Sequence, residues 1–191
     1  MRTSLIKMII GCVIAFTVSS CNQTKLSNEE AKSLVVNSLN LPISINAYVS
    51  YRGKSGFLKE FSMDILKREG YIMDVGDWLF STTQVTNKGR EYLVNTEDIN
   101  GSPEFTFRMY DIDFEAIKGI AINKEQQTAT VRFALKYTNI TPVAEAIDEN
   151  IQKPLESELV FKKFDSGWQL QSDQNKTPRE LVNDILKSNK N

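Results

Sequence analysis

The hydrophobic pattern in the first half of the chain predicts two helices. Residues 27–39 and 57–69 carry apolar side chains at the three- and four-residue spacing that places them on one helix face. Ser27 stands three residues before Glu30, a spacing typical of a capping box at a helix start. Gly70 directly follows the second segment, as glycine often does beyond a helix end.

Alternation of apolar and polar residues predicts strands in much of the remaining chain. The alternating runs occur at 43–49, 105–107, 112–122, 128–140 and 155–164. The alternation breaks near Ala116, which predicts a β-bulge. Short helices are expected to begin at Pro142 and Pro178, because proline is favoured in the first turn of a helix. The fold class that follows is α+β, with an antiparallel sheet and short helices in its C-terminal part.

Residues 57–94 resemble a winged-helix segment. The helix ends in Leu66-Lys67-Arg68-Glu69-Gly70-Tyr71-Ile72, and a β-hairpin with a turn at Gly76-Asp77 follows. A short helix is expected over 87–94. The residues from Val85 to Leu93 are similar to the segment that follows the wing in many transcription factors. The resemblance implies a winged-helix-like shape, whereas the mixed charge of the helix does not fit a phosphate backbone. Nucleic acid is therefore not expected as a partner.

Residues 161–170 resemble the last hairpin of cystatin-like and nuclear-transport-factor-2-like sheets. The segment consists of a strand, the turn Asp165-Ser166-Gly167, then Trp168 and a second strand. Trp168 shares a face with Leu170 and is expected in the core. The resemblance implies a sheet that forms a pocket or a binding face.

The first twenty residues have the pattern of a secretory signal. Arg2 and Lys7 precede an apolar run over 8–18, and small residues follow it. The run is shorter than the roughly 20 apolar residues that span a bilayer. The pattern predicts export of the remaining chain.

The residues Val18-Ser19-Ser20-Cys21 resemble the lipobox of bacterial lipoproteins. The resemblance implies that residues 1–20 are removed, that Cys21 carries lipid, and that 21–26 form a tether to the membrane. With Asn22 after the cysteine, the resemblance favours anchoring in the outer membrane. We therefore expect a periplasm-facing body in the cell envelope. The alternatives are an ordinary signal peptide beside an unrelated cysteine, and an uncleaved anchor.

Composition removes several kinds of chemistry. The chain has no histidine and two cysteines, of which Cys12 lies in the signal and Cys21 is the expected lipid site. Ser-His-Asp and Cys-His catalysis and His/Cys zinc sites are therefore excluded. Carboxylate and Ser-Lys chemistry remain open. We expect a protein that is not an enzyme and has no cofactor.

A polar stretch at 95–103 predicts a division of the exported body. Residues 27–99 would form the winged-helix-like α+β region. Residues 100–191 would form the antiparallel sheet with a C-terminal helix.

The candidate contact residues are Trp78, Asp111, Asp113 and Glu115. The three carboxylates alternate, so on a strand they share one face, where they could bind calcium or a basic partner. The alternative is the solvated face of a half-buried sheet. Trp78 lies near the tip of the hairpin, where it is either a core residue or an exposed contact.

Two functions of different classes are compatible with these patterns. The first is a non-catalytic envelope lipoprotein that binds a protein or cell-wall partner through the wing or the sheet. The alternative is a lipid-tethered small-ligand carrier, or a carboxylate-based enzyme, with a pocket on the C-terminal sheet.

Overall fold

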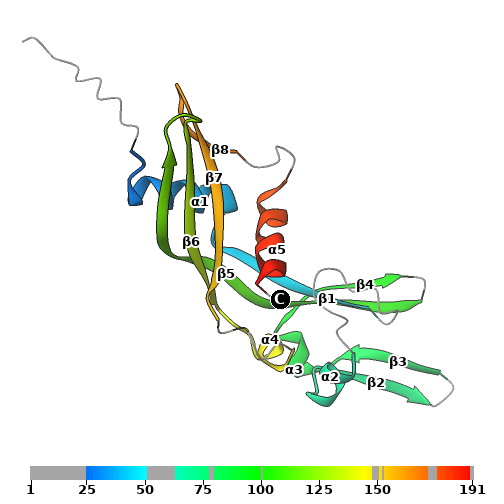
Figure 1. Cartoon of the computed structure of the whole chain (residues 1–191). Coiled ribbons are helices and arrows are strands. Elements are labelled where there is room, and N and C mark those ends of the chain that lie inside the picture. The colour runs from blue at the N-terminus through cyan, green and yellow to red at the C-terminus, as the bar shows by residue number, and fades with distance from the viewer. Residues whose placement is uncertain are drawn as a thin grey trace, which may run out of the picture.

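The computed structural model describes residues 25–50, 63–77, 80–99, 101–147, 151, 153–171 and 176–189 of the chain. The helices in these ranges are α1 (Asn28–Leu39), α2 (Met63–Arg68), α3 (Asn87–Arg90), α4 (Pro142–Ile147) and α5 (Pro178–Ser188). The strands are β1 (Ile43–Ser50), β2 (Ile72–Asp77), β3 (Phe80–Val85), β4 (Leu93–Ile99), β5 (Ser102–Asn123), β6 (Thr128–Thr138), β7 (Leu155–Phe164) and β8 (Gly167–Leu170). The helices and the antiparallel sheets confirm the α+β class (Figure 1).

Strand β5 is the spine of the main sheet. Its 22 residues join the two runs that the sequence shows at 105–107 and 112–122. One edge of β5 pairs with β1, and the opposite edge pairs first with β4 and then with β6. Strands β7 and β8 continue the sheet beyond β6. The sheet therefore extends along the whole length of β5, with β4 beside the start of this strand and β6, β7 and β8 beside its end (Figure 1).

The bulge expected near Ala116 is confirmed. The pairing of β5 with β6 shifts register between Phe114 and Ala116, and again between Ile117 and Gly119. An extra residue in one strand bends that strand and increases its twist. These two shifts lie in the part of β5 that pairs with β6, where the sheet curls.

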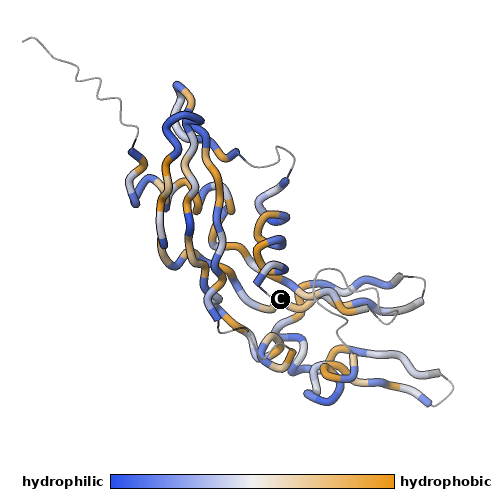
Figure 2. The backbone as a smooth tube through the Cα atoms, in the orientation of Figure 1, coloured by the Kyte–Doolittle hydropathy of each residue, from blue (hydrophilic) through white to orange (hydrophobic). Residues whose placement is uncertain are grey.

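The main core lies between the sheet and two helices. Helix α1 packs against β5 and β8, α5 packs against β7, and the two helices contact each other. Alternate residues of β6, among them Val131, Phe133 and Leu135, are fully buried, as their pattern predicts. Figure 2 shows the hydrophobic side of α5 turned towards the sheet. Trp168 is 7% exposed, so its expected place in the core is confirmed.

Capping residues define the starts of α1 and α5, and the cap at Ser27 was expected from the sequence. The Ser27 hydroxyl accepts a hydrogen bond from the backbone N–H of Glu30 at 3.2 Å. Thr177 and Glu180 form a complete capping box at the start of α5. Each cap satisfies backbone N–H groups that have no partner within the helix.

The division expected near residue 100 falls between β4 and β5, which pair as a hairpin. The core continues across this position, because Leu39, Phe107 and Phe133 belong to one buried cluster. The polar residues there belong to an exposed hairpin end, where the Asp98 carboxylate accepts a hydrogen bond from the Gly101 N–H at 2.7 Å.

Strands β2 and β3 form a separate two-stranded sheet, the β2–β3 hairpin. The turn expected at Gly76-Asp77 is wrong, because these residues pair with Ser81 and Phe80. The helix expected over 87–94 is wrong beyond Arg90, since the chain enters β4 at Leu93.

Close backbone packing fixes the base of this hairpin against α3. The Thr86 N–H donates to the Tyr71 carbonyl at 3.0 Å, and the Thr86 hydroxyl donates to the Gly70 carbonyl at 2.7 Å. Gly89 packs so tightly that an added Cβ would lie 2.1 Å from the Tyr71 carbonyl oxygen. Lys88 extends over the Tyr71 ring, with its Nζ 4.3 Å from the ring centroid.

We expect Gly89→Ala to destabilise the protein, because the new methyl group meets backbone that cannot move without breaking these bonds. Overpacking of this kind costs about 1–3 kcal/mol in the free energy of unfolding, measured by urea denaturation. Gly119→Ala is the matched control, since its Cβ would meet only the flexible Arg132 side chain at 3.2 Å. Equal losses in the two variants would contradict this account of the hairpin base.

Candidate functional site

The candidate residues lie in different surroundings. Cys21 and Trp78 lie outside the described residues. Asp111, Asp113 and Glu115 all lie on β5, yet Asp111 is buried, Asp113 is half-buried and Glu115 is exposed. The three carboxylates therefore do not form one open acidic face.

Asp111 is the centre of a hydrogen-bond network. Its Oδ1 accepts from the Ser44 hydroxyl at 2.7 Å, and its Oδ2 accepts from the Asn139 amide at 2.7 Å. The Arg108 guanidinium donates to both oxygens, at 3.2 and 3.0 Å. These partners lie on β1, on β5 and directly after β6, so one carboxylate joins three segments of the sheet.

The same region anchors α4. The Thr141 N–H donates to the Met109 carbonyl at 2.8 Å, and the Thr141 hydroxyl donates to the Arg108 carbonyl at 2.9 Å. This hydroxyl also accepts from the Ala144 N–H at 3.2 Å, in the first turn of the helix. The network around Asp111 thus extends to the segment that follows β6.

Opposing effects act on the pKa of Asp111. Desolvation by burial is the largest single effect and raises the pKa, because it disfavours the charged form. The hydrogen bonds from Ser44 and Asn139 and the charge of Arg108 lower it. The hydrogen bonds and the Arg108 charge together outweigh desolvation, so the pKa of Asp111 lies below its ordinary value and the group is a carboxylate at neutral pH.

The other two carboxylates have different neighbours. An oxygen of Asp113 accepts from the Phe114 N–H at 2.7 Å, and Asp113 stands opposite Lys136 in the strand register. Glu115 lies at the first register shift between β5 and β6. Among the described residues, no group of three or more Asp, Glu, Cys or His side chains is arranged to hold a metal ion.

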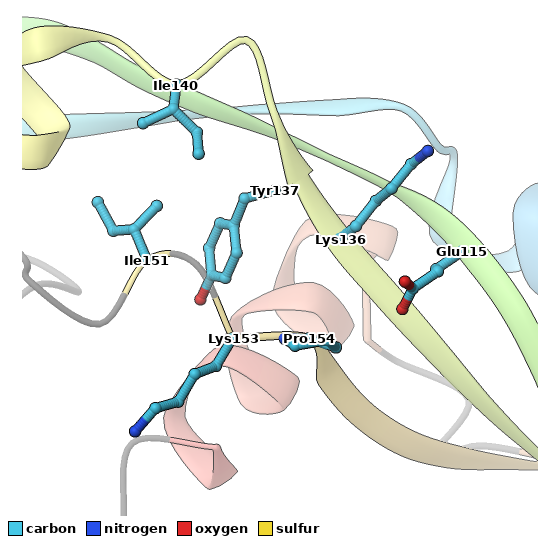
Figure 3. Close-up of a pocket in the computed structure, with 7 residues that line it drawn as sticks. All are labelled: Glu115, Lys136, Tyr137, Ile140, Ile151, Lys153 and Pro154. Atoms are coloured by element: carbon cyan, nitrogen blue, oxygen red, sulfur yellow. The ribbon is translucent and has the colours of Figure 1, made fainter.

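A small hollow lies beside Glu115, at the end of β6. Its volume is about 270 Å³, and its walls are formed by Glu115, Lys136, Tyr137, Ile140, Ile151, Lys153 and Pro154 (Figure 3). The Tyr137 ring stands in the middle of these residues, while the Lys136 and Lys153 side chains extend in different directions from it. We call this feature the β6 hollow.

Sequence reasoning placed Lys136 and Tyr137 on β6 but did not identify the hollow. Its walls come from β5, from β6, from the connection between β6 and α4, and from the connection between α4 and β7. These residues carry no common spacing along the chain, so no sequence signal could have brought them together.

The β2–β3 hairpin presents a second candidate surface. Met73 and Val75 are 49% and 39% exposed and, being two residues apart on a strand, share one face. On the other face, Asp74 accepts from Lys67 at 2.7 Å and from the Thr83 hydroxyl at 2.8 Å. The hydrogen bonds from Lys67 and Thr83 hold the pKa of Asp74 below its ordinary value. We call Met73 and Val75 the hairpin apolar face.

We expect Asp111→Asn to lower the free energy of unfolding by about 1–3 kcal/mol at pH 7, because the new amide N–H₂ would face the donors Arg108 and Asn139. The contribution of the Asp111 carboxylate to the free energy of unfolding is complete above the pKa of an unfolded aspartate, about 3.9. It is lost as the pH falls through the lower pKa that Asp111 has in the folded protein.

Urea denaturation from pH 7 to pH 3 measures this difference. The gap between wild type and Asp111→Asn should stay constant to about pH 5 and narrow below about pH 4. Asp165→Asn, at an exposed turn, is the control and should stay within about 0.5 kcal/mol of wild type. A gap that widens on acidification would overturn the assignment.

No helix in the described ranges has the length and apolarity needed to cross a membrane. Comparison with known protein families, curated proteins and solved structures gives no match to this chain.

Proposed function

We propose that this protein is a non-catalytic lipoprotein of the bacterial cell envelope that binds a protein or cell-wall partner through the β2–β3 hairpin. The lipid would be on Cys21, in the pattern Val18-Ser19-Ser20-Cys21, and the body would face the periplasm from the outer membrane. The observation that carries the partner-binding part is the hairpin apolar face, Met73 and Val75.

The placement of the hairpin supports this role. The face that carries Asp74 and Thr83 turns towards α2, since Lys67 bonds Asp74 and Thr83 is 7% exposed. The hairpin apolar face therefore turns away from α2. Because exposed apolar side chains are the usual contact residues of protein interfaces, this face suits a partner.

The start of the described chain and the hairpin lie at different ends of the molecule. Leu26 is 6% exposed, so the chain is already packed there, and the residues from Cys21 to Lys25 would reach at most about 17 Å. Helix α1 lies against the β6–β7 end of the sheet, whereas β2 and β3 lie at the opposite end (Figure 1). The hairpin would thus project from the membrane-anchored body.

Metabolic labelling with a palmitate analogue tests the anchor. We expect label on the wild-type chain and none on Cys21→Ala, because only the cysteine at the end of the lipobox is acylated. Cys12→Ala, which removes the other cysteine in the chain, should keep the label. Label that persists in Cys21→Ala would refute the lipid anchor.

Affinity capture of the membrane-anchored protein tests the partner. Met73→Thr with Val75→Thr keeps residues that favour strands but removes the apolar contact, and we expect recovery of the partner to fall at least about tenfold. Val94→Thr is the control, because Val94 is 53% exposed but lies on β4. Capture that both variants leave unchanged, or no reproducible partner with wild type, would contradict the proposal.

A small-ligand carrier is the second candidate, and the β6 hollow favours it. The hollow combines apolar walls with a few charged groups, as small-molecule sites do. Glu115 is the carboxylate among the described residues that line it.

A further inference from the structure

We propose that the turn between β7 and β8 rests on the surface of a membrane that contains anionic phospholipids, with Phe164 among the lipid headgroups and the neighbouring lysines beside their phosphates. We call residues 162–167 the β7–β8 tip. This proposal rests on the lipid anchor of the proposed function, and it names the side of the body that faces the bilayer.

The β7–β8 tip exposes an aromatic side chain between cations. Phe164 is 45% exposed, and the Lys162 Nζ lies 5.7 Å from its ring centroid. Lys163 belongs to the opposite face of β7, where its Nζ lies 5.3 Å from the centroid of the Trp168 ring. Lysines therefore flank both faces of the hairpin around an exposed ring. Apolar and aromatic side chains beside lysines are the usual groups through which proteins bind to the membrane interface.

The turn between β5 and β6 lies beside the β7–β8 tip. The Lys163 N–H donates to the Gln127 carbonyl at 2.8 Å, and Thr128 stands opposite Lys162 in the strand register. Lys124 is exposed in this second turn. Because the backbone hydrogen bond joins the two turns, they present one surface with three lysines.

The three lysines are open to a negatively charged surface. None of Lys124, Lys162 and Lys163 forms an ion pair with another described residue. Two exposed carboxylates, Glu125 and Asp165, lie in the same turns, so one net positive charge remains. Attraction between exposed charges falls off within about 10 Å at 0.1 M salt. The charge therefore acts only when the tip is already close to the membrane, which is where the tether would hold it.

The start of the described chain lies at the same end of the molecule as the β7–β8 tip. Helix α1 contacts β8, and Figure 1 shows the start of α1 and the turn between β7 and β8 in the same half of the molecule, away from β2, β3 and β4. Leu26 is buried, and the residues from Cys21 to Lys25 would reach at most about 17 Å. With lipid on Cys21, so short a tether would hold this end of the body against the bilayer.

Quenching of Trp168 fluorescence by membrane lipids tests the contact. The chain has two tryptophans, so Trp78→Phe leaves Trp168, which lies next to Lys163 at the tip, as the single reporter. The full-length protein is reconstituted into vesicles of phosphatidylcholine and phosphatidylglycerol that carry a nitroxide on the lipid headgroup. We expect clear quenching in these vesicles and weaker quenching in vesicles of phosphatidylcholine alone, because lysines attract anionic headgroups.

Variants at the tip assign the contact to its residues. In the Trp78→Phe background, Phe164→Ser with Lys162→Gln removes the exposed ring and one cation, and should lower the quenched fraction at least about twofold. Val94→Ser is the matched control, because Val94 is 53% exposed but lies on β4, beside the opposite end of β5, and it should leave the quenching unchanged. All three proteins should unfold at the same urea concentration, since the replaced side chains are exposed.

The outcomes separate the contact from the anchor. Equal quenching with and without the tip substitutions, or no quenching in vesicles that contain the protein, would overturn the contact while the lipid anchor stands. A loss of quenching as large in Val94→Ser as in the tip variant would overturn the contact as well. Wild-type protein that neither takes up the palmitate label nor sediments with the vesicles would overturn the anchor, and this proposal with it.

Discussion

The buried carboxylate of Asp111 lies in the middle of β5, where the strand that pairs with one edge of β5 changes from β4 to β6. The pairing with β4 ends at Phe107, the pairing with β6 begins at Asp111, and β1 continues to Ile112. Asp111 bonds to Ser44 on β1, to Arg108 on β5 and to Asn139 directly after β6, so its charge is compensated only when these three segments are in place. Because a buried charge without partners is costly, the Asp111 network favours one arrangement of the junction.

Much of the local structure could be predicted because local residues determine it. The alternation along β6, the capping residues Ser27 and Thr177 and the bulge near Ala116 are each encoded within a few positions. The continuity of β5 could not be predicted from its polar start, since residues near Asp98 have the same composition in a hairpin end as in a linker. The burial of Asp111 could not be predicted either. Its partners Ser44 and Asn139 are distant in sequence, so the local pattern indicated only an open acidic face.

The Asp111 network and the β6 hollow are neighbours along the chain. Asn139, which bonds Asp111, directly precedes Ile140 in the wall of the hollow, and Asn139 has a backbone φ of 49°. This left-handed conformation, which asparagine tolerates better than most residues, turns the chain out of β6 towards α4. The junction that holds the sheet together therefore also positions one wall of the hollow, whereas the hairpin apolar face depends on the separate contacts of Thr86 and Gly89.

The irregular pairing of β5 has a consequence for encounters between copies of the protein. Beyond Ile112, the edge of β5 that faces β1 has no strand partner among the described residues. A straight open edge could pair with the same edge of another copy. The two register shifts bend the strand along this stretch, and the exposed Lys118 adds a charge there. The irregularities that curl the sheet are therefore also features that disfavour edge-to-edge pairing.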